Sequence, residues 1–446
     1  MKKLRPYLLP ILLCLPGLNF AQGMIDTVGA RALLDSAEAQ IKTKAYDEAI
    51  LNCMDAIQMY ESMDMKSADE MALAYEHMGR ALKLKKNYDL AIKAFQQCVD
   101  IREASPEPKD KLLAQCYYGI AHSHNDKQEY DLSLEPYHKV LQLREEIYGP
   151  YHEALVSLHR VVGNVYFKNG NGDQAIEHYQ KGLEIQQHLD ADPQVFETQL
   201  LSNIAEVMGA RGDLDQAILY GQKAINAARQ YERNARSITY QGIAYLNLAG
   251  YLEQKGEHEL ALKHLETAVE LLDEGQGPGN PTTAIVHGDM ANVYYNMGEW
   301  EKAEEYYLKW LNNWKETMPP GYFYFAEIYM RFGDFYVKTG QPDKGLELLE
   351  MAKEKLEATF EGNHPELSRV YILLGNAYLA KSDFVQARVH YQYALLASQD
   401  QESLIAQCTD PGFLVKSYMG LGSIYSERYA KDQRLTHIPL ALENYD

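Results

Sequence analysis

Small residues return at a fixed interval along most of the chain, inside stripes of apolar positions. Twelve residues before each of them stands a second Gly or Ala, from Ala37 to Gly375, and seven residues after most of them stands a third small residue. The central members are 42 residues apart except for one interval of 44: Ala49, Ala91, Ser133, Ala175, Ala217, Ala261, Ala303, Gly345 and Ala387. Self-similarity at one period over many copies is typical of a repeat protein.

Each repeat is predicted to contain two helices joined by a tight turn. Glycine recurs between the two apolar stripes, where it can adopt the left-handed conformation that ends a helix. These glycines are Gly170, Gly212, Gly256, Gly298 and Gly340. An acidic residue follows three positions later, as in Asp173 and Glu301. We expect this carboxylate to open the second helix, where it satisfies free backbone N–H groups and complements the helix dipole.

The aromatic residues follow the same period, which explains 34 Tyr against 11 Phe. One set lies four residues after the central small residue: Phe95, Tyr137, Tyr179, Tyr307 and Tyr391. A second set lies three residues after the first-helix Gly or Ala: Tyr166, Tyr294, Tyr336 and Tyr378. Small residues let the helices approach closely, the aromatic rings fill the gaps, and a Tyr can keep its hydroxyl at the wet edge.

Local departures from the pattern are few. Gly221 replaces the aromatic residue, Trp310 replaces a small one, and the first repeat lacks the turn glycine. We attribute the 44-residue interval to a longer linker at 275–281. This linker is either a hinge between two stacks of repeats or a surface insertion, and we favour the insertion because short loop additions cost little.

The repeat resembles the tetratricopeptide repeat (TPR) family, in its 42-residue form of the kinesin-light-chain type. Its signature small and aromatic positions are the residues given above, and the linkers at 148–153 and 361–366 are similar to that type's Gly-x-x-His-Pro connector. The resemblance implies an all-α, right-handed TPR solenoid. We expect nine repeats over residues 24–397 and an irregular, truncated last repeat over residues 398–446.

The first residues have the pattern of a secretory signal peptide. Lys2, Lys3 and Arg5 precede an apolar run that ends near residue 20, and small residues follow at Ala21 and Gly23. The run is shorter than the roughly 20 residues of a membrane-spanning helix and contains two prolines. We therefore expect a signal peptide over residues 1–21, a mature chain without an integral membrane span, and a periplasmic or extracellular location.

Charge and reactive residues argue against several kinds of function. The formal net charge of −20 disfavours nucleic acid as a partner. Cys53, Cys98 and Cys116 fall at packing positions, so we expect buried thiols, with a Cys98–Cys116 disulfide as the alternative. The histidines that invite a metal site are interpreted as structural or solvated: His122, His124, His152 and His364. We expect no cofactor, no metal and no catalytic residues in this chain.

One set of polar residues recurs in register and is the candidate binding site. Asn164, Asn292 and Asn376 directly follow the first-helix Gly or Ala, whereas Asn203 and Asn247 lie two residues before it. Positions three apart share one helix face. The resemblance places this face in the concave groove, where amides hydrogen-bond an extended peptide, and Arg160 lies near it. The alternative is that these asparagines bond only to neighbouring helices.

The function that we predict is binding of a peptide or protein segment by an exported scaffold. The alternative is the recognition arm of a larger protein. The chain's last part resembles the final repeats that precede a caspase-like CHAT peptidase domain, and exported arrays of sensor kinases begin in a similar way. Either module would lie beyond residue 446.

Overall fold

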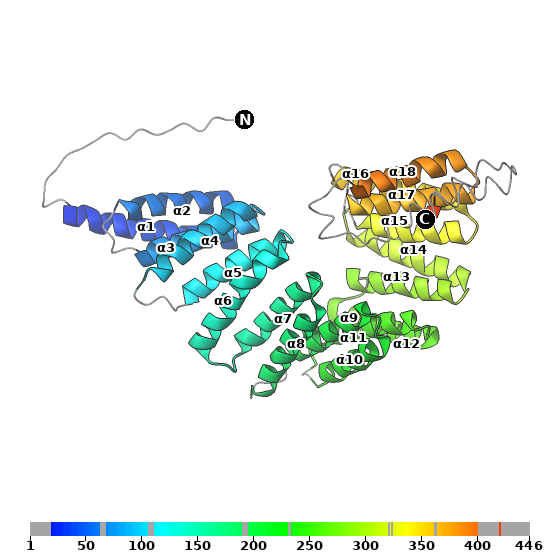
Figure 1. The fold of residues 1–446 in the computed structure, drawn as a ribbon, viewed down its shortest axis with the longest axis horizontal. Helices are drawn as coiled ribbons and strands as arrows, with labels where there is room; N and C mark the ends of the chain where they lie inside the picture. The colour runs from blue at the N-terminus through cyan, green and yellow to red at the C-terminus, as the bar shows by residue number, and fades with distance from the viewer. Residues whose placement is uncertain are drawn as a thin grey trace. The chain divides into compact units, whose positions relative to one another are not determined.

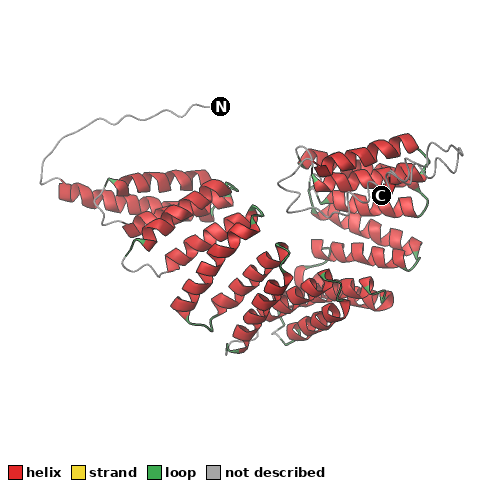
Figure 2. Ribbon diagram, viewed as in Figure 1, coloured by secondary structure: helices red, strands yellow, loops and turns green. Residues whose placement is uncertain are grey.

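The computed structural model describes residues 19–62, 68–105, 111–189, 195–230, 233–319, 322, 324–360, 364–399 and 419–420. All regular structure in these ranges is helical (Figure 2). The chain divides into two compact units, residues 1–190 and residues 191–446, which are described in turn. The signal peptide predicted at 1–21 lies almost wholly outside the described residues, and so does nearly all of the truncated repeat predicted at 398–446.

The described residues of unit 1 form four helical pairs that follow one another along the chain (Figure 1). The pairs are α1 (Asn19–Lys42) with α2 (Tyr46–Glu61), α3 (Ala68–Leu84) with α4 (Tyr88–Glu103), α5 (Lys111–Asp126) with α6 (Tyr130–Tyr148), and α7 (Glu153–Lys168) with α8 (Gly172–Gln187). Each pair corresponds to one copy of the 42-residue pattern.

In the part of unit 2 that the structure describes there are five pairs of the same kind. They are α9 (Val195–Ala210) with α10 (Leu214–Ala228), α11 (Ala235–Gln254) with α12 (His258–Gln276), α13 (Pro281–Asn296) with α14 (Trp300–Thr317), α15 (Phe325–Lys338) with α16 (Pro342–Thr359), and α17 (Pro365–Ala380) with α18 (Phe384–Gln399).

The turn between the two helices of a pair uses a left-handed residue. The five predicted glycines have φ between 78° and 84°, which confirms their role. Four other turns place a residue with a side chain in the same conformation, at φ from 59° to 65°: Lys44, Lys86, Gln128 and Ser382. A Cβ in this region costs about 1–2 kcal/mol, so these turns are held by the packing of their helices.

The acids at the start of the second helices connect successive repeats. Asp89 accepts a hydrogen bond from Lys127 at 2.7 Å, and Asp215 lies 2.8 Å from the ammonium of Lys255. Asn169 donates to Asp131 at 2.7 Å in the same way. Each partner lies at the end of the next repeat's first helix. We expected these acids to open the second helix, and each lies in its first turn. The structure adds an exposed polar link between repeats, worth about 0–1 kcal/mol each.

The aromatic residue of the second helix packs on glycine from two repeats. Phe95 is 1% exposed and lies between Gly79 and Gly119, where an added Cβ would come within 2.7 Å and 2.5 Å of its ring. Tyr391 meets Gly375 and Gly420 in the same manner, at 2.6 Å and 2.5 Å. Glycine at these positions therefore sets how closely the helices approach each ring.

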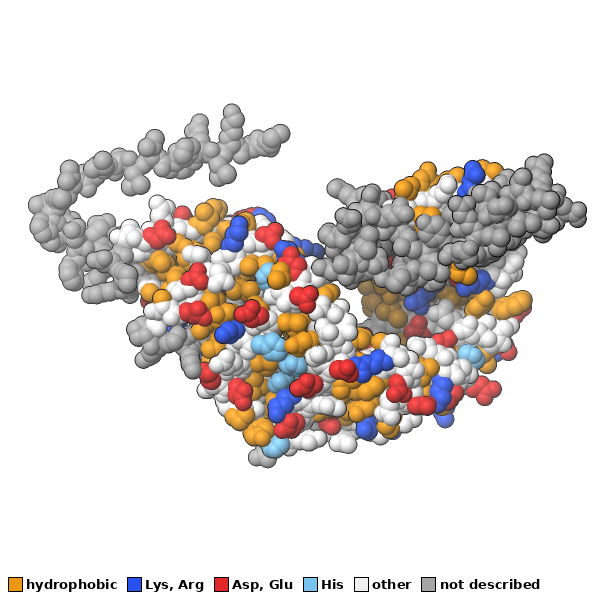
Figure 3. All heavy atoms as spheres, in the orientation of Figure 1, with side chains coloured by type: hydrophobic (Ala, Val, Ile, Leu, Met, Phe, Trp, Pro, Cys, Tyr) orange, Lys and Arg blue, Asp and Glu red, His pale blue; other side chains and the backbone are white. Residues whose placement is uncertain are grey.

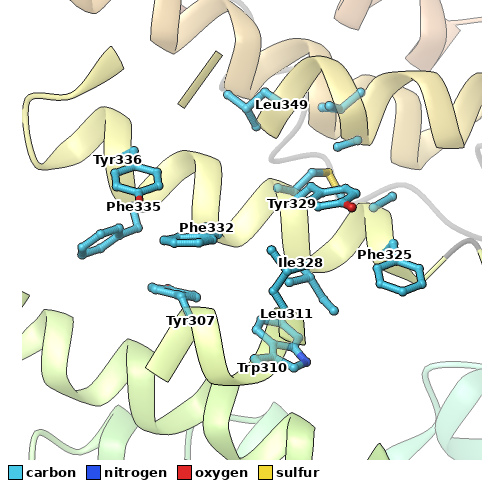
Figure 4. Packing of buried hydrophobic residues seen from close by; sticks show 14 of the residues in the cluster. Tyr307, Trp310, Leu311, Phe325, Ile328, Tyr329, Phe332, Phe335, Tyr336 and Leu349 are labelled. Atoms are coloured by element: carbon cyan, nitrogen blue, oxygen red, sulfur yellow. The ribbon is translucent and has the colours of Figure 1, made fainter. Parts of the chain in front are cut away.

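Trp310 departs from the repeat pattern and is accommodated by a compensating glycine. Its indole is 1% exposed, and a Cβ on Gly288 of α13 would lie 2.6 Å from its Cε3 atom. The surrounding cluster is rich in aromatic residues, with Tyr307 stacked on Phe332 at 5.1 Å between ring centroids (Figure 4).

The attribution of the 44-residue interval to the linker at 275–281 was wrong, because that interval runs from Ala217 to Ala261 and its two extra residues lie between Ala217 and Ala249. The linker at 275–281 lies within unit 2, and the boundary between the units falls after Asp190 instead. Gly277 ends α12 with φ of 92°. Asn280 caps α13 by accepting from the backbone N–H of Thr283 at 2.9 Å and donates to the carbonyls of Leu272 and Gly277. These bonds favour a packed insertion over a hinge.

The favoured interpretation of the cysteines was wrong for two of them. Cys98 of α4 and Cys116 of α5 form a disulfide with 6.3 Å between their Cα atoms, joining two consecutive repeats. Both are fully buried, so packing position alone did not distinguish a thiol from a bridge. Cys53 is a buried free thiol, as expected, and burial raises its pKa to about 12.

Candidate functional site

The predicted site residues all lie on first helices. Asn164 and Arg160 lie on α7 of unit 1, and the other four asparagines lie on helices of unit 2: Asn203 on α9, Asn247 on α11, Asn292 on α13 and Asn376 on α17. Asn247 and Asn376 are exposed, and the rest are half-buried. The structure thus brings four of the asparagines into one unit and places Asn164 with Arg160 in the other.

Three asparagines are bonded to the second helix of their own repeat. The buried tyrosine fifteen residues later donates its hydroxyl proton to the asparagine Oδ1 atom in each case. Tyr179 reaches Asn164 at 2.8 Å, Tyr307 reaches Asn292 at 2.5 Å, and Tyr391 reaches Asn376 at 2.6 Å. This bond satisfies a hydroxyl whose ring is almost wholly buried.

The tyrosine bond also orients the amide. Because Oδ1 faces the tyrosine, the Nδ2 donors of the same side chain point the other way. Within the described ranges, Nδ2 of Asn292 and of Asn376 makes no hydrogen bond to protein. The arrangement therefore combines the two interpretations of these residues: the oxygen has a structural partner, and the donors are left for another group.

The row that contains Asn203 and Asn247 continues with charged residues that the sequence argument missed. Asp289 and Arg331 occupy the same place, two residues before the first-helix Gly or Ala. Their place in the 42-residue repeat is the signal that predicts them, since the residue type differs while the position does not. Arg331 lies 3.5 Å from Asp289. This position of the repeat therefore holds an asparagine on α9 and α11 and one member of an ion pair on α13 and α15.

Arg331 belongs to a network that is centred on Glu327 of α15. Arg331 donates to Glu327 at 2.5 Å, and Arg369 of α17 contacts both carboxylate oxygens, at 2.5 Å and 3.2 Å. Burial would raise the pKa of Glu327, but the two arginines outweigh it and lower that pKa below its usual value. Burial raises the pKa of Asp289 to about 6, against the opposing effect of Arg331.

Arg160 lies beside Tyr118 rather than in a bonded network. Burial raises the pKa of Tyr118, and the charges of Arg144 and Arg160 oppose the shift. The Nε atom of Arg160 is buried and has no hydrogen-bond partner among the described residues. Its charge is thus close to the asparagine face of unit 1.

The predicted structural histidines have structural roles in the linkers. His152 and His364 cap α7 and α17 by accepting from backbone N–H groups at 3.1 Å and 3.2 Å. Their rings stack on Tyr148 and Phe360, with centroids 4.4 Å and 3.6 Å apart. His124 bonds Glu129 at 2.7 Å, and His122 lies 3.1 Å from Asp126.

A further histidine cluster lies in unit 1. His159 of α7 and His178 of α8 place their Nδ1 atoms 3.0 Å apart, and His138 of α6 bonds the hydroxyl of Tyr166 at 2.9 Å. Figure 3 shows histidine side chains gathered on one face of this unit. Burial, and to a smaller extent the neighbouring histidines, lower the pKa of both His159 and His178 to about 4. No metal-binding group of three or more His, Cys, Asp or Glu occurs among the described residues.

Comparison with known proteins gives consistent matches. The family described as tetratricopeptide repeat matches residues 72–105, 112–187, 155–230, 240–316 and 324–396. Human tetratricopeptide repeat protein 23 is 27% identical over 169 residues, which cover 36% of this chain and 38% of that protein. The type IV pilus assembly protein PilF of Pseudomonas aeruginosa is 26% identical over 183 residues, covering 41% and 64%. The chain thus spans less than two thirds of either relative.

Among solved structures, the apo form of the quorum sensor NprR from B. thuringiensis has a TM-score of 0.55 and 18% identity. The alignment covers 81% of this chain and 99% of NprR. This likeness shows the fold, and the predicted all-α TPR solenoid is confirmed. No helix in the described ranges has the length and apolarity that crossing a membrane requires.

Proposed function

We propose a function from one premise: the chain belongs to the tetratricopeptide repeat family. Solenoids of this kind present extended surfaces that suit long, flexible ligands. The chain is an exported interaction scaffold without catalytic activity of its own, and it binds an extended peptide or protein segment. The ligand lies along the first helices, on the face that carries Asn203, Asn247, Asn292 and Asn376 in unit 2, with Asn164 and Arg160 as the corresponding residues of unit 1.

The oriented amides are the observation that carries this proposal. The tyrosine bond holds Oδ1 of Asn292 and Asn376 in place, so two N–H donors per side chain remain for a ligand. An extended peptide offers backbone carbonyls that can accept from donors of this kind. Because the amide is already held, less side-chain entropy is lost on binding than for a free asparagine.

Selection from a random peptide display library, followed by calorimetry, tests the proposal. We expect the library to yield peptides that bind the intact chain. In a variant with Asn203→Ala and Asn247→Ala, the affinity for a selected peptide should fall by about tenfold or more, since each lost amide removes a hydrogen bond worth about 1 kcal/mol. The far-ultraviolet dichroism of the variant should stay unchanged.

A matched control separates binding from folding. Asn312→Ala changes an exposed asparagine on the second helix α14, away from the row, and should leave the affinity unchanged. The proposal fails if no peptide is enriched, or if the variant at Asn203 and Asn247 binds a selected peptide as tightly as the native chain does.

Two observations support export. The basic and apolar start has the pattern of a signal peptide. A buried disulfide between Cys98 and Cys116 is typical of proteins that fold in an oxidising compartment. Mass spectrometry of the protein recovered from its producing cells should show cleavage near Ala21 and a bridge that resists alkylation. An intact Met1 with alkylated Cys98 and Cys116 would contradict export.

A further inference from the structure

A cavity of about 380 Å³ opens in unit 2 between α10, α11 and α12. Its polar lining comes from Arg229, Arg233, Ser237, Gln241, Tyr245 and Thr267. This volume lies within the range of small-molecule sites in proteins, which begins at about 300 Å³. Two guanidinium groups at one cavity are unexpected in a chain with a formal net charge of −20.

The repeat pattern shows what is unusual about Arg229. It stands twelve residues after the central small residue Ala217. In most other repeats this place holds an acid: Glu61, Glu103, Glu145, Asp273 and Glu357. Tyr245 stands four residues before the first-helix residue Ala249 of the next repeat, the same place as Tyr117 and Tyr371.

The acid and the tyrosine of successive repeats bond to each other. The hydroxyl of Tyr117 donates to Glu103 at 2.5 Å, and that of Tyr371 donates to Glu357 at 2.9 Å. In each case burial is the largest cause of a raised tyrosine pKa, and the acceptor carboxylate adds to it. A built-in carboxylate thus accepts a hydrogen bond from the tyrosine hydroxyl at the junction between two repeats.

At the cavity this carboxylate is replaced by a cation. Arg229 donates to the hydroxyl oxygen of Tyr245, whose ring is 6% exposed. The tyrosine oxygen therefore accepts a hydrogen bond at this junction, and its O–H group does not donate to a described carboxylate of the neighbouring repeat. Arg233 already holds Glu274 with two contacts, at 3.2 Å and 2.5 Å. In the part of the chain that the structure describes, no carboxylate lies within ion-pair distance of Arg229.

We propose that this cavity binds a carboxylate group of a ligand, in the place that Glu103 and Glu357 occupy at their own junctions. Arg229 supplies the charge, and the hydroxyl of Tyr245 donates its proton to the bound carboxylate, as Tyr117 and Tyr371 do internally. Gln241 adds a side-chain amide to the lining, whereas Ser237 and Thr267 already donate to the carbonyls of Asn234 and Lys263. This site is separate from the asparagine face and does not depend on the function proposed for it.

A second replacement of the same kind supports the link between the cation and the cavity. Lys315 stands twelve residues after Ala303, and a cavity of about 390 Å³ opens beside it and Tyr329. Phe325 and Met351 take the places of Gln241 and Thr267 there. The lining of the second cavity already contains a carboxylate, that of Glu354, whereas the described lining of the first contains none.

Calorimetry with defined carboxylates tests the proposal on the intact chain. The probes are succinate and the blocked tripeptide acetyl-Ala-Glu-Ala-amide, with dimethyl succinate and acetyl-Ala-Gln-Ala-amide as uncharged counterparts. We expect at least one charged probe to bind and its counterpart not to bind. Binding of succinate alone identifies a small organic acid, and binding of the tripeptide alone identifies an acidic residue of a polypeptide; both support a carboxylate site.

Substitutions locate the binding. Arg229→Glu restores the acid of the other repeats, so the chain should fold, and its new carboxylate should accept a hydrogen bond from the hydroxyl of Tyr245. Binding of the charged probe should fall by about tenfold or more, as for the loss of a bond to a charged group. Tyr245→Phe removes only the hydroxyl and should also weaken binding. Arg236→Glu makes the same charge change at a residue outside the lining and should bind like the native chain.

Two results would overturn this proposal. One is that neither charged probe binds the native chain better than its uncharged counterpart. The other is that Arg229→Glu and Tyr245→Phe both bind a charged probe as tightly as the native chain.

Discussion

Replacing Gly288 and Gly250 by alanine should change the stability of unit 2 in opposite directions. Both glycines lie inside helices, α13 and α11, and neither has a positive φ. A Cβ added to Gly250 meets no atom within 4 Å, whereas one added to Gly288 comes within 2.6 Å of the Trp310 indole. The substitution is the same, so only the surroundings differ.

The expected size follows from two opposing terms. Alanine in place of glycine in a helix interior stabilises by up to about 1 kcal/mol, which is the full expected effect of Gly250→Ala. Overpacking a filled core costs about 1–3 kcal/mol. Trp310 is 1% exposed, so its ring cannot move into solvent without loss of packing. Gly288→Ala should therefore destabilise by about 1 kcal/mol net, and the two variants should differ by about 2 kcal/mol.

Urea unfolding followed by far-ultraviolet dichroism measures both variants against the native chain. A third comparison uses Trp310→Ala as the background, where the Cβ added at position 288 meets no indole. In that background Gly288→Ala should become stabilising, which gives a coupling between the two sites. The reasoning is refuted if Gly288→Ala raises the unfolding midpoint as Gly250→Ala does, or if its effect is the same with and without the indole.

Three further predictions concern the turns, the histidines and the disulfide. Lys86→Gly should raise the urea unfolding midpoint of unit 1, because it removes the steric strain of a side chain at φ of 63°. The gain of about 1–2 kcal/mol exceeds the entropy cost of the added glycine. An equal or lower midpoint would contradict this. Acid should destabilise unit 1, since the folded-state pKa of His159 and of His178 is about 4 and lies below the unfolded value of about 6.5. The two neutral histidines contribute fully to the free energy of unfolding above a pH of about 6.5, and this contribution is lost as the pH falls toward 4. Urea unfolding midpoints measured across this window should therefore decline less in a variant with His159→Gln and His178→Gln. Changing both Cys98 and Cys116 to Ala should lower the free energy of unfolding by about 3 kcal/mol, because the disulfide restricts the entropy of the unfolded chain. A reductant should then have no further effect on thermal unfolding. An unchanged midpoint would show that the disulfide does not contribute to the stability of unit 1.

The repeats and their turns could be predicted from the sequence because local chemistry repeats there. The turn glycines and the buried aromatics each depend on positions within one repeat. His364 was expected to be structural or solvated, and only the structure shows that it caps α17. The left-handed Lys86 could not be predicted in this way, since its conformation is imposed by the two helices that it joins. The same holds for Gly288, whose role depends on Trp310 from the other helix of the pair.

Contacts between repeats were harder to predict than contacts within them. Lys127 and Asp89 are 38 residues apart, and each looks like an ordinary surface charge alone. Cys98 and Cys116 occupy normal packing positions, so nothing local distinguishes a thiol from a bridge. The asparagine row was found by its register, but its continuation into Asp289 and Arg331 was missed because the residue type changes while the position does not.

Side-chain amide resonances of asparagine test the central claim, that the first-helix asparagines hold an extended peptide. The chain would be labelled with ¹⁵N-asparagine, and the signals of Asn292 and Asn376 assigned from Asn292→Gln and Asn376→Gln. A peptide selected on the intact chain should shift the Nδ2 signals of both residues, because their donors bond the ligand while Oδ1 stays on the tyrosine. Saturating peptide that leaves both signals unmoved would contradict the account.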